Sequence, residues 1–447
     1  MKVGPLMRYP RIFPLVLIGL SYGAACLGQA TIVTDDRVFS GIPFEKWLAD
    51  GDQGKFHWSV RVTAGELSNH QRLKSRVDLQ VDGNDVAARR GHGYLIMLVQ
   101  FEDSDHRIYR SHGTLDLQEV TESAAKSDVV YTQEAFLRPG EYQVSLLIFD
   151  TKNGDHSALQ RKVRANPIKN DPFPSAWEQL PAVEFTGSVD APDSWYLPLV
   201  SGKLKLGLAT RRPVRIEVLV NASPTAAGAG ARTGQVNHRS LAELIPAAKV
   251  LTEVKLEKGT MGVSLLDLTR QSVLFEQNTT GDLDWPQLRA ALIEADPNKI
   301  DAKALAHRRG NAQFFIAQMK QRLHLEGESA NAEDPVRIGI VLSGPMSFDS
   351  GEDRHPIEGV NALNGRLFYV RYHALVPQQR EQSVPEPLRI GRRGVAAAPT
   401  SLNIVPQEPL DGLVNLIKPL QPRVFDVYTP DQFRKTLSSI LEEIARL

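Results

Sequence analysis

The sequence lacks the features that mark several common protein classes. Cys26 is the only cysteine among 447 residues, so no internal disulfide can form. The 52 basic residues are balanced by 52 acidic ones, whereas a dedicated nucleic-acid-binding protein needs a basic surface. No His-Glu-x-x-His, Gly-x-Ser-x-Gly or phosphate-cradling glycine motif occurs, and the histidines show no metal-ligand spacing. We therefore expect no catalytic residue, no cofactor and no nucleic-acid partner.

Long apolar runs are also missing after the N-terminus. Residues 12–20 form a short apolar run, which follows Lys2, Arg8 and Arg11 and precedes small residues that end at Ala30. This pattern is typical of a signal peptide, and the run is shorter than the roughly 20 residues of a spanning helix. We predict that residues 1–30 are a signal peptide and that the chain is exported, periplasmic or secreted, and not membrane-spanning after cleavage. Retention of this segment as an anchor is the alternative.

Residues 31–166 have the pattern of a β-sandwich. Residues 57–62 and 77–81 alternate polar and apolar side chains, and 94–101 form a continuous apolar run typical of a buried strand. A strand at 142–149 is followed by a turn with Asn153 and Gly154 and by a returning strand at 159–163. The segment Pro139-Gly-Glu-Tyr142 resembles the entry to a late strand of immunoglobulin-like domains. The expected fold of this part is an immunoglobulin-like β-sandwich.

Residues 167–205 are rich in proline and have few apolar runs, which predicts a linker. The prolines are Pro167, Pro172, Pro174, Pro181, Pro192 and Pro198.

Residues 206–447 alternate between strand and helix patterns. Strands are expected at 215–220, 261–268, 272–275, 337–342, 366–372 and 424–428. Helices are expected from Ser240, over 312–323, over 412–417 and from a cap at Thr429. Such alternation predicts a doubly wound, mostly parallel sheet with helices on both faces. A proline-rich insertion over 375–408 interrupts the pattern.

The best-placed polar motif follows the first strand of this α/β domain, where open parallel sheets bind ligands. Asn221, Ser223 and Thr225 stand at alternate positions, and Ser343-Gly344 ends the fourth strand. The domain resembles a von Willebrand factor A domain, in which the first strand ends in Asp-x-Ser-x-Ser. Its combination with a β-sandwich and a signal peptide resembles the secreted von Willebrand A-related proteins of acidobacteria. In the von Willebrand A family, the aspartate and hydroxyls help to hold a divalent metal that ligates an acidic side chain of a partner.

The motif departs from the family pattern, because Asn221 stands in place of the first aspartate and Ser343 in place of the second. Hard cations prefer anionic oxygens, so we expect no metal, or weak binding at most by Asn221, Ser223 and Thr225. Asp349 and Asp353 could return carboxylates to the same edge. An Asx turn at Asn221 that merely ends the strand is the structural alternative.

The resemblance implies an exported, non-catalytic binding or adhesion protein. Its α/β domain would engage a protein of the cell envelope or outside the cell through Asn221, Ser223, Thr225 and Ser343. Two alternatives stay open: a hydrolase of unrecognised type with its site near Ser223 and Ser343, and a scaffold that binds nothing at this edge.

Overall fold

The computed structural model describes ten segments of the chain, and all structural statements below concern these residues. They are 42–51, 53–186, 201–223, 236–278, 283–294, 310–325, 334–348, 355–358, 365–373 and 411–447. The predicted signal peptide, Thr225, Asp349, Asp353 and the 375–408 insertion lie outside the described residues.

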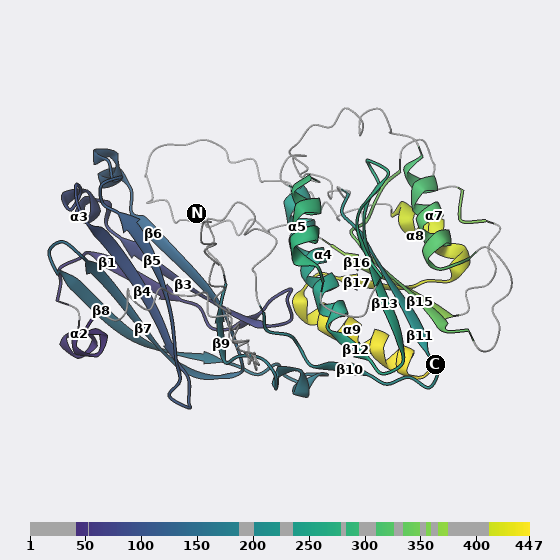
Figure 1. Cartoon of the computed structure of the whole chain (residues 1–447), viewed down its shortest axis with the longest axis horizontal. Coiled ribbons are helices and arrows are strands. Elements are labelled where there is room, and N and C mark those ends of the chain that lie inside the picture. Colours follow the sequence, from purple (N-terminus) through teal and green to yellow (C-terminus); the bar gives the residue numbers. More distant parts are fainter. Residues whose placement is uncertain are drawn as a thin grey trace, which may run out of the picture.

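The described chain is a mixture of helices and strands, with two antiparallel sheets, a two-stranded parallel sheet and one mixed sheet (Figure 1). This agrees with the expectation of an α/β part combined with an all-β part.

The elements of the first part are α2 (Phe44–Asp50), β1 (Trp58–Val62), β2 (Glu66–Leu67), β3 (Leu73–Val81), α3 (Gly83–Ala88), β4 (Tyr94–Glu102), β5 (Ile108–Asp116), η1 (Glu122–Lys126), β6 (Val129–Leu137), β7 (Gly140–Asp150), β8 (His156–Ala165), η2 (Pro174–Trp177) and β9 (Val183–Phe185). Those of the second part are β10 (Leu206–Leu208), β11 (Val214–Asn221), α4 (Val236–Thr252), β12 (Val254–Leu256), β13 (Gly259–Asp267), β14 (Ser272–Gln277), α5 (Trp285–Glu294), α7 (Asn311–Arg322), β15 (Val336–Ser343), β16 (Gly365–Tyr372), α8 (Gly412–Ile417), η4 (Lys418–Leu420), β17 (Arg423–Val427) and α9 (Pro430–Ala445).

The first part consists of two antiparallel sheets. One has the order β1-β3-β6-β9, with β2 paired to β3, and the other has the order β5-β4-β7-β8. Inward residues of the two sheets, among them Leu79 and Phe101, belong to one buried core. The Tyr142 hydroxyl lies within hydrogen-bond distance of the carbonyl oxygens of Arg138 (2.8 Å), on the preceding backbone, and of Ala182 (3.0 Å).

The segment that the sequence predicts to be a linker is packed in part. The Trp177 side chain is buried and donates from Nε1 to Asp171 Oδ2 at 2.8 Å, and β9 pairs with β6. The linker interpretation therefore does not extend to residues 167–186. The linker was predicted because proline disfavours regular structure. Trp177, Leu180 and Val183 are nevertheless buried, and their packing fixes the segment in place.

The second part is built on a six-stranded sheet with the order β14-β13-β11-β15-β16-β17. All neighbours are parallel except β14, which is antiparallel to β13. Counted along the chain, the spatial order is 3-2-1-4-5-6, so the order reverses between β11 and β15. Helix α4 begins at Val236 and not at Ser240, where the capping pattern had predicted its start.

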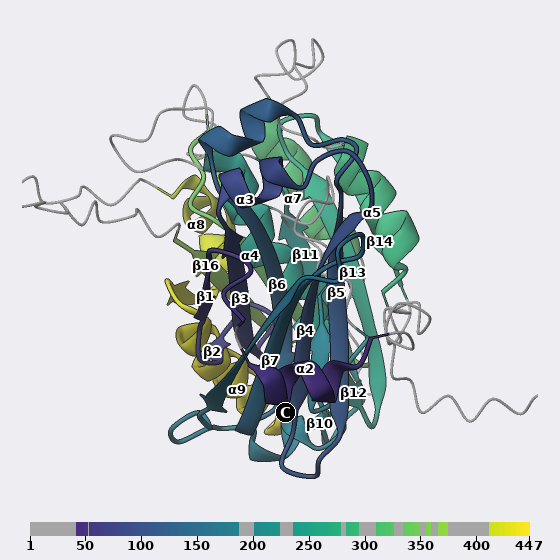
Figure 2. The same ribbon diagram turned by 90° about the vertical axis from the view of Figure 1, so that its left-hand side faces the viewer.

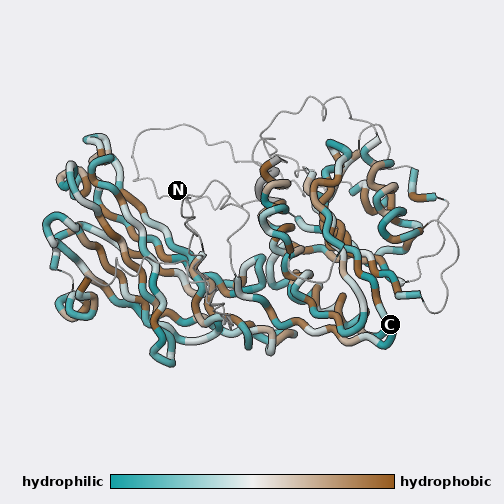
Figure 3. Tube along the Cα trace, viewed as in Figure 1, coloured by the Kyte–Doolittle hydropathy of each residue, from teal (hydrophilic) through white to brown (hydrophobic). Residues whose placement is uncertain are grey.

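Helices cover both faces of this sheet. Apolar residues of α4, α5 and α9 pack with Ile216 and Ile338 on one face, and those of α7 and α8 pack with Leu219 and Val341 on the other. Figure 1 shows α4 and α9 on the side of the sheet that faces the sandwich, and Figure 2 gives the view from the sandwich end. Hydrophobic residues concentrate along the central strands (Figure 3). No helix within the described residues is both long enough and apolar enough to cross a bilayer.

Candidate functional site: the carboxyl edge of the mixed sheet

Polar side chains form a row at the carboxyl ends of the parallel strands, on the face of the sheet that α7 and α8 cover. Ser343 is the cross-strand partner of Arg371, which is the partner of Asp426, while Asn221 follows the pair Val220–Leu342. Paired residues on neighbouring strands point to the same face of a sheet. The row therefore crosses the point where the strand order reverses, which is where doubly wound sheets bind ligands.

Three of the four predicted binding residues meet at this edge, and each is almost completely buried. Asn221 Nδ2 donates to Ser343 Oγ at 2.9 Å and lies 3.5 Å from Met346 Sδ. Asn221 Oδ1 accepts from the Ser223 backbone N–H at 3.0 Å, which is the Asx turn named above as the structural alternative. The fourth residue, Thr225, lies outside the described part of the chain.

The hydroxyls of Ser223 and Ser343 are also engaged inside the protein. Ser343 Oγ donates to the Gly344 carbonyl oxygen at 2.7 Å. Ser223 Oγ accepts from the Leu268 N–H at 2.6 Å and lies 3.4 Å from Asp267 Oδ1. An amide N–H₂ has no lone pair for a cation, so the side of Asn221 that faces Ser343 offers no ligand to a metal ion. Among the described residues, no group of three or more His, Cys, Asp and Glu side chains is placed to hold a metal ion.

Asp267 is a carboxylate of this edge that sequence reasoning missed. It ends β13, and its Oδ1 accepts from the backbone N–H groups of Thr269 (3.0 Å) and Arg270 (3.1 Å). Its Oδ2 accepts from Arg270 Nη1 at 3.0 Å. The sequence could have identified it, because Asp267, like Asn221, is a polar residue at the end of a buried strand. Its charge is neutralised by Arg270, so Asp267 closes its own turn.

A second polar cluster continues the row toward β17. Arg371 donates from Nε to Asp426 Oδ1 at 2.6 Å, and its Nη1 lies 3.4 Å from Asp411 Oδ2. His373 Nε2 lies 2.6 Å from the same Asp426 oxygen and stacks on Tyr428, with ring centroids 4.4 Å apart. Tyr428 is 40% exposed. This end of the row is therefore accessible, whereas the Asn221–Ser343 end is closed.

Burial and charge act in opposite directions on the carboxylates of this cluster. Burial raises the pKa of Asp411, although backbone donors from Met346 and Leu413 oppose the shift. Burial also acts to raise the pKa of Asp426, but hydrogen bonds from Arg371 and His373 outweigh it and lower that pKa. Asp426 thus stays ionised and holds Arg371 and His373 in place.

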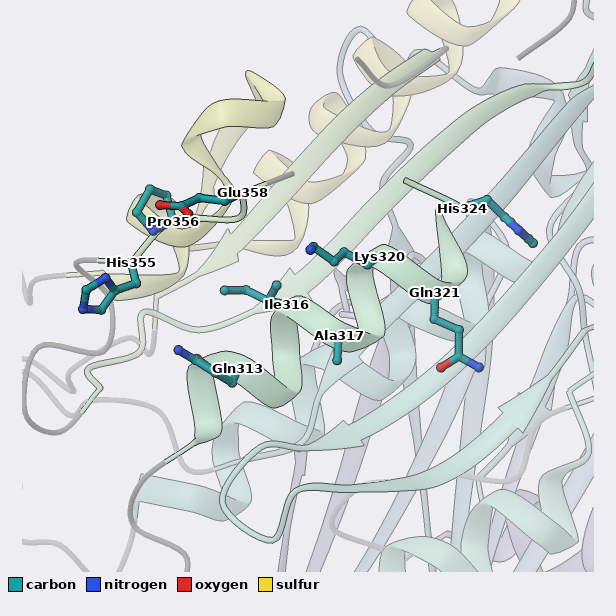
Figure 4. Close-up of a pocket in the computed structure, with 9 residues that line it drawn as sticks. All are labelled: Gln313, Ile316, Ala317, Lys320, Gln321, His324, His355, Pro356 and Glu358. Carbon is teal, nitrogen blue, oxygen red and sulfur yellow. The ribbon is translucent and has the colours of Figure 1, made fainter. Parts of the chain in front are cut away.

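A groove of about 830 Å³ lies away from these residues, along α7. Figure 4 shows Lys320 and His324 on the helix side and His355 and Glu358 on the facing segment. None of the predicted site residues lines it.

Comparisons with known proteins assign no family to the chain. No family model matches, and no curated protein matches. A solved structure described as Northeast Structural Genomics Consortium target SoR45 is 13% identical, with 26% of this chain and 89% of that chain covered and a TM-score of 0.17. The putative ApaA protein from Bordetella pertussis is 14% identical, covering 26% of this chain and 97% of that one, with a TM-score of 0.15. A Bacteroides uniformis beta-glucuronidase is 10% identical over 71% of this chain and 36% of its own, with a TM-score of 0.17.

Proposed function

We propose that this chain is an exported binding protein whose α/β domain engages another protein at the carboxyl edge of its sheet. In this proposal the first part is an immunoglobulin-like sandwich and the second a von Willebrand A-like domain with a degenerate metal motif. The observation that carries the proposal is the strand order 3-2-1-4-5-6, with Asn221 and Ser343 at the two strand ends where that order reverses. The functional step is an analogy drawn from fold.

The hydrogen bonds of the edge favour binding over hydrolysis. A nucleophilic serine needs a base that accepts its proton. Ser343 donates to the carbonyl of Gly344, and Ser223 Oγ lies beside Asp267, whose oxygens already accept from Thr269 and Arg270. His373, the histidine of the edge, is engaged with Asp426.

Partner contact would fall on the accessible end of the row, and it can be tested with two matched tyrosines. Tyr428 is 40% exposed at the sheet edge, and Tyr94 is 48% exposed on the sandwich. Cell-envelope proteins captured by the purified chain should be reduced by Tyr428→Ala and retained by Tyr94→Ala. Capture should persist in a chelator, because the proposed contact needs no metal. Equal capture by both variants would contradict an interface at this edge.

The hydrolase alternative is separated from binding by a panel of fluorogenic substrates. Turnover that is abolished by Ser223→Ala or Ser343→Ala would replace the binding proposal with an enzymatic one. We expect no turnover that depends on either serine.

Export is tested on the native protein. Cleavage of the proposed signal peptide should give an N-terminus near Thr31 by mass spectrometry. Recovery of the intact Met1 peptide from a cytoplasmic species would contradict export.

A further inference from the structure

Three buried ion pairs lie at or near the junction between the sandwich and the mixed sheet. Arg434 of α9 donates from Nε and Nη2 to the two oxygens of Asp171, at 2.7 and 2.9 Å. Arg72, the residue before β3, pairs with Glu184 of β9, and Lys249 of α4 pairs with Glu253. Glu253 also accepts from the Leu204 N–H at 2.7 Å, and Glu184 from the Gly202 N–H. Arg434 and Asp171 therefore form a buried ion pair between the two parts, while each of the other two pairs lies within one part.

On the sandwich side of the junction, the turn between β2 and β3 contacts helix α9. Gln71 is completely buried and donates from Nε2 to the carbonyl oxygen of Pro430, at the start of α9, at 3.0 Å. Arg434 Nη1 lies 3.4 Å from the Gln71 carbonyl oxygen. His70 is the preceding residue, is 9% exposed, and packs edge-on against Phe136 with ring centroids 5.4 Å apart.

The charged residues that act on the pKa of His70 are all cations. Arg72 lies in the same turn as His70, Lys74 on β3 and Lys249 on α4. The nearby carboxylates are already paired, Glu184 with Arg72, Glu134 with Lys74, and Glu253 with Lys249. His70 Nδ1 is buried and has no hydrogen-bond partner. A protonated imidazole here would be a buried cation with an unpaired N–H next to three like charges.

We propose that His70 is a pH-sensitive latch, and that its protonation releases α4 and α9 of the mixed-sheet part from the sandwich. In the closed junction, burial and the charges of Lys249, Arg72 and Lys74 hold the pKa of His70 well below its usual value of 6.5. Opening exposes the imidazole and returns its pKa toward that value. Because the closed state has the lower pKa, the junction keeps its full stability above about pH 6.5. Below that pH the ratio of open to closed molecules rises by up to about tenfold per pH unit.

The opening is measured between two spin labels on the full chain with Cys26→Ser, which leaves no native cysteine. Lys162→Cys on β8 and Lys435→Cys on α9 place exposed labels on the two parts. Pulsed electron paramagnetic resonance should show one short distance at pH 8. A longer distance should grow in between pH 6.5 and 5 and disappear when the pH is raised again. No change across this range would overturn the proposal.

The assignment to His70 rests on matched histidine variants. His70→Gln is neutral at all these pH values, so it should keep the short distance down to pH 5. His156→Gln, an equally buried position that stacks on Trp47 of α2 away from the junction, should open as the wild type does. Opening of His70→Gln with the wild-type profile would overturn the assignment.

A second variant leaves the imidazole in place and guards against a folding defect in His70→Gln. Lys249→Gln removes the cation with the largest effect on His70 and so raises the pKa of His70 in the closed state, which should flatten the increase of the open fraction at the acidic end of the range. An increase steeper than in the wild type would contradict the proposal.

Discussion

Asn221 uses both ends of its amide inside the protein, toward the Ser223 N–H and toward Ser343 Oγ. Asn221→Asp replaces the donating end with an anionic oxygen that faces Ser343 Oγ and Met346 Sδ. We expect this variant to lower the free energy of unfolding by about 1–3 kcal/mol, because a buried donor is lost and a charge is left without a partner. Urea denaturation measures the loss, and Asn221→Leu serves as the uncharged control.

Substitution of Asn221 also tests the proposal that this sheet edge is a degenerate metal-binding motif. Asn221→Asp combined with Ser343→Asp returns two carboxylates to neighbouring strand ends, so Mg²⁺ should stabilise the double variant and not the wild type. Calorimetry with Mg²⁺ and Mn²⁺ on both proteins measures the difference. Tight binding by the wild type would show that other carboxylates complete a site. The absence of any gain in the double variant would count against a shared cleft.

Gly202 lies where the chain passes the buried pair of Arg72 and Glu184. A Cβ at this position would stand 2.7 Å from Glu184 Oε2 and 2.8 Å from Arg72 Nη1. Gly202→Ala should therefore push the pair apart and cost about 1–3 kcal/mol. Gly207→Ala is the matched control, since its Cβ would meet nothing within 4 Å. Thermal melts that place both variants at the same temperature would contradict the steric reasoning.

At the scale of elements, α9 is the helix whose start the sequence predicts most directly. Thr429 Oγ1 accepts from the Gln432 N–H at 3.3 Å, and Gln432 Oε1 accepts from the Thr429 N–H at 3.2 Å, which together form a capping box. Thr429→Ala should lower stability by about 1 kcal/mol. Ser438→Ala, in the middle of the same helix, should change the free energy of unfolding very little. Chemical denaturation of both variants measures the difference. A loss as large at Ser438 would rule out the cap as the cause.

Elements with strong periodicity could be predicted from the sequence, and elements that depend on a partner could not. β4 and β7 follow from continuous apolar runs, and α7 from its helical spacing. β5, with the sequence Ile-Tyr-Arg-Ser-His-Gly-Thr-Leu-Asp, has polar residues on both faces and is only half-buried. β9 and β10 are three residues long and exist because β6 and β12 pair with them.

The candidate site shows the same division. The strand-end rule predicted that Asn221, Ser223 and Ser343 would meet, because parallel strands end at one edge. It could not predict that the amide would donate to Ser343, since that depends on side-chain orientation across two strands, whereas the local bond to the Ser223 N–H is the Asx turn that the sequence analysis named as the alternative. The cluster of Arg371, Asp411 and Asp426 was missed because its members lie far apart along the sequence.

At the scale of the whole molecule, the pair of Asp171 and Arg434 joins the two parts. Both side chains are almost completely buried. Asp171→Asn would leave the Arg434 guanidinium buried without its counter-charge, so we expect a loss of about 3–5 kcal/mol in the free energy of unfolding. Glu178→Gln removes the exposed partner of Lys205 and should cost less than about 1 kcal/mol. Equal losses in the two variants, measured by urea denaturation at pH 8, would contradict a stabilising role for the buried pair.

Asp171 also gives the junction a second pH limit, distinct from that of His70. Burial acts to raise the pKa of Asp171, but hydrogen bonds from Arg434 and Trp177 outweigh it and lower that pKa. A lowered carboxyl pKa contributes stability above the unfolded value of about 4 and loses it as pH falls further. Denaturation of the wild type as a function of pH should therefore show a loss below about pH 4. In Asp171→Asn this part of the pH dependence should be reduced.

Gln71 and Arg434 touch although 363 residues separate them along the chain. A ribosome delivers the turn that carries His70, Gln71 and Arg72 long before helix α9, which the turn contacts. Closing so long a loop is slow relative to local folding, so the turn stays without its contacts to α9 until that helix has been synthesised. A chain that stops before Pro430 would expose this turn permanently. Helix α9 thus distinguishes a chain that contains it from one that stops before it, at a surface that proteases can reach in the shorter form.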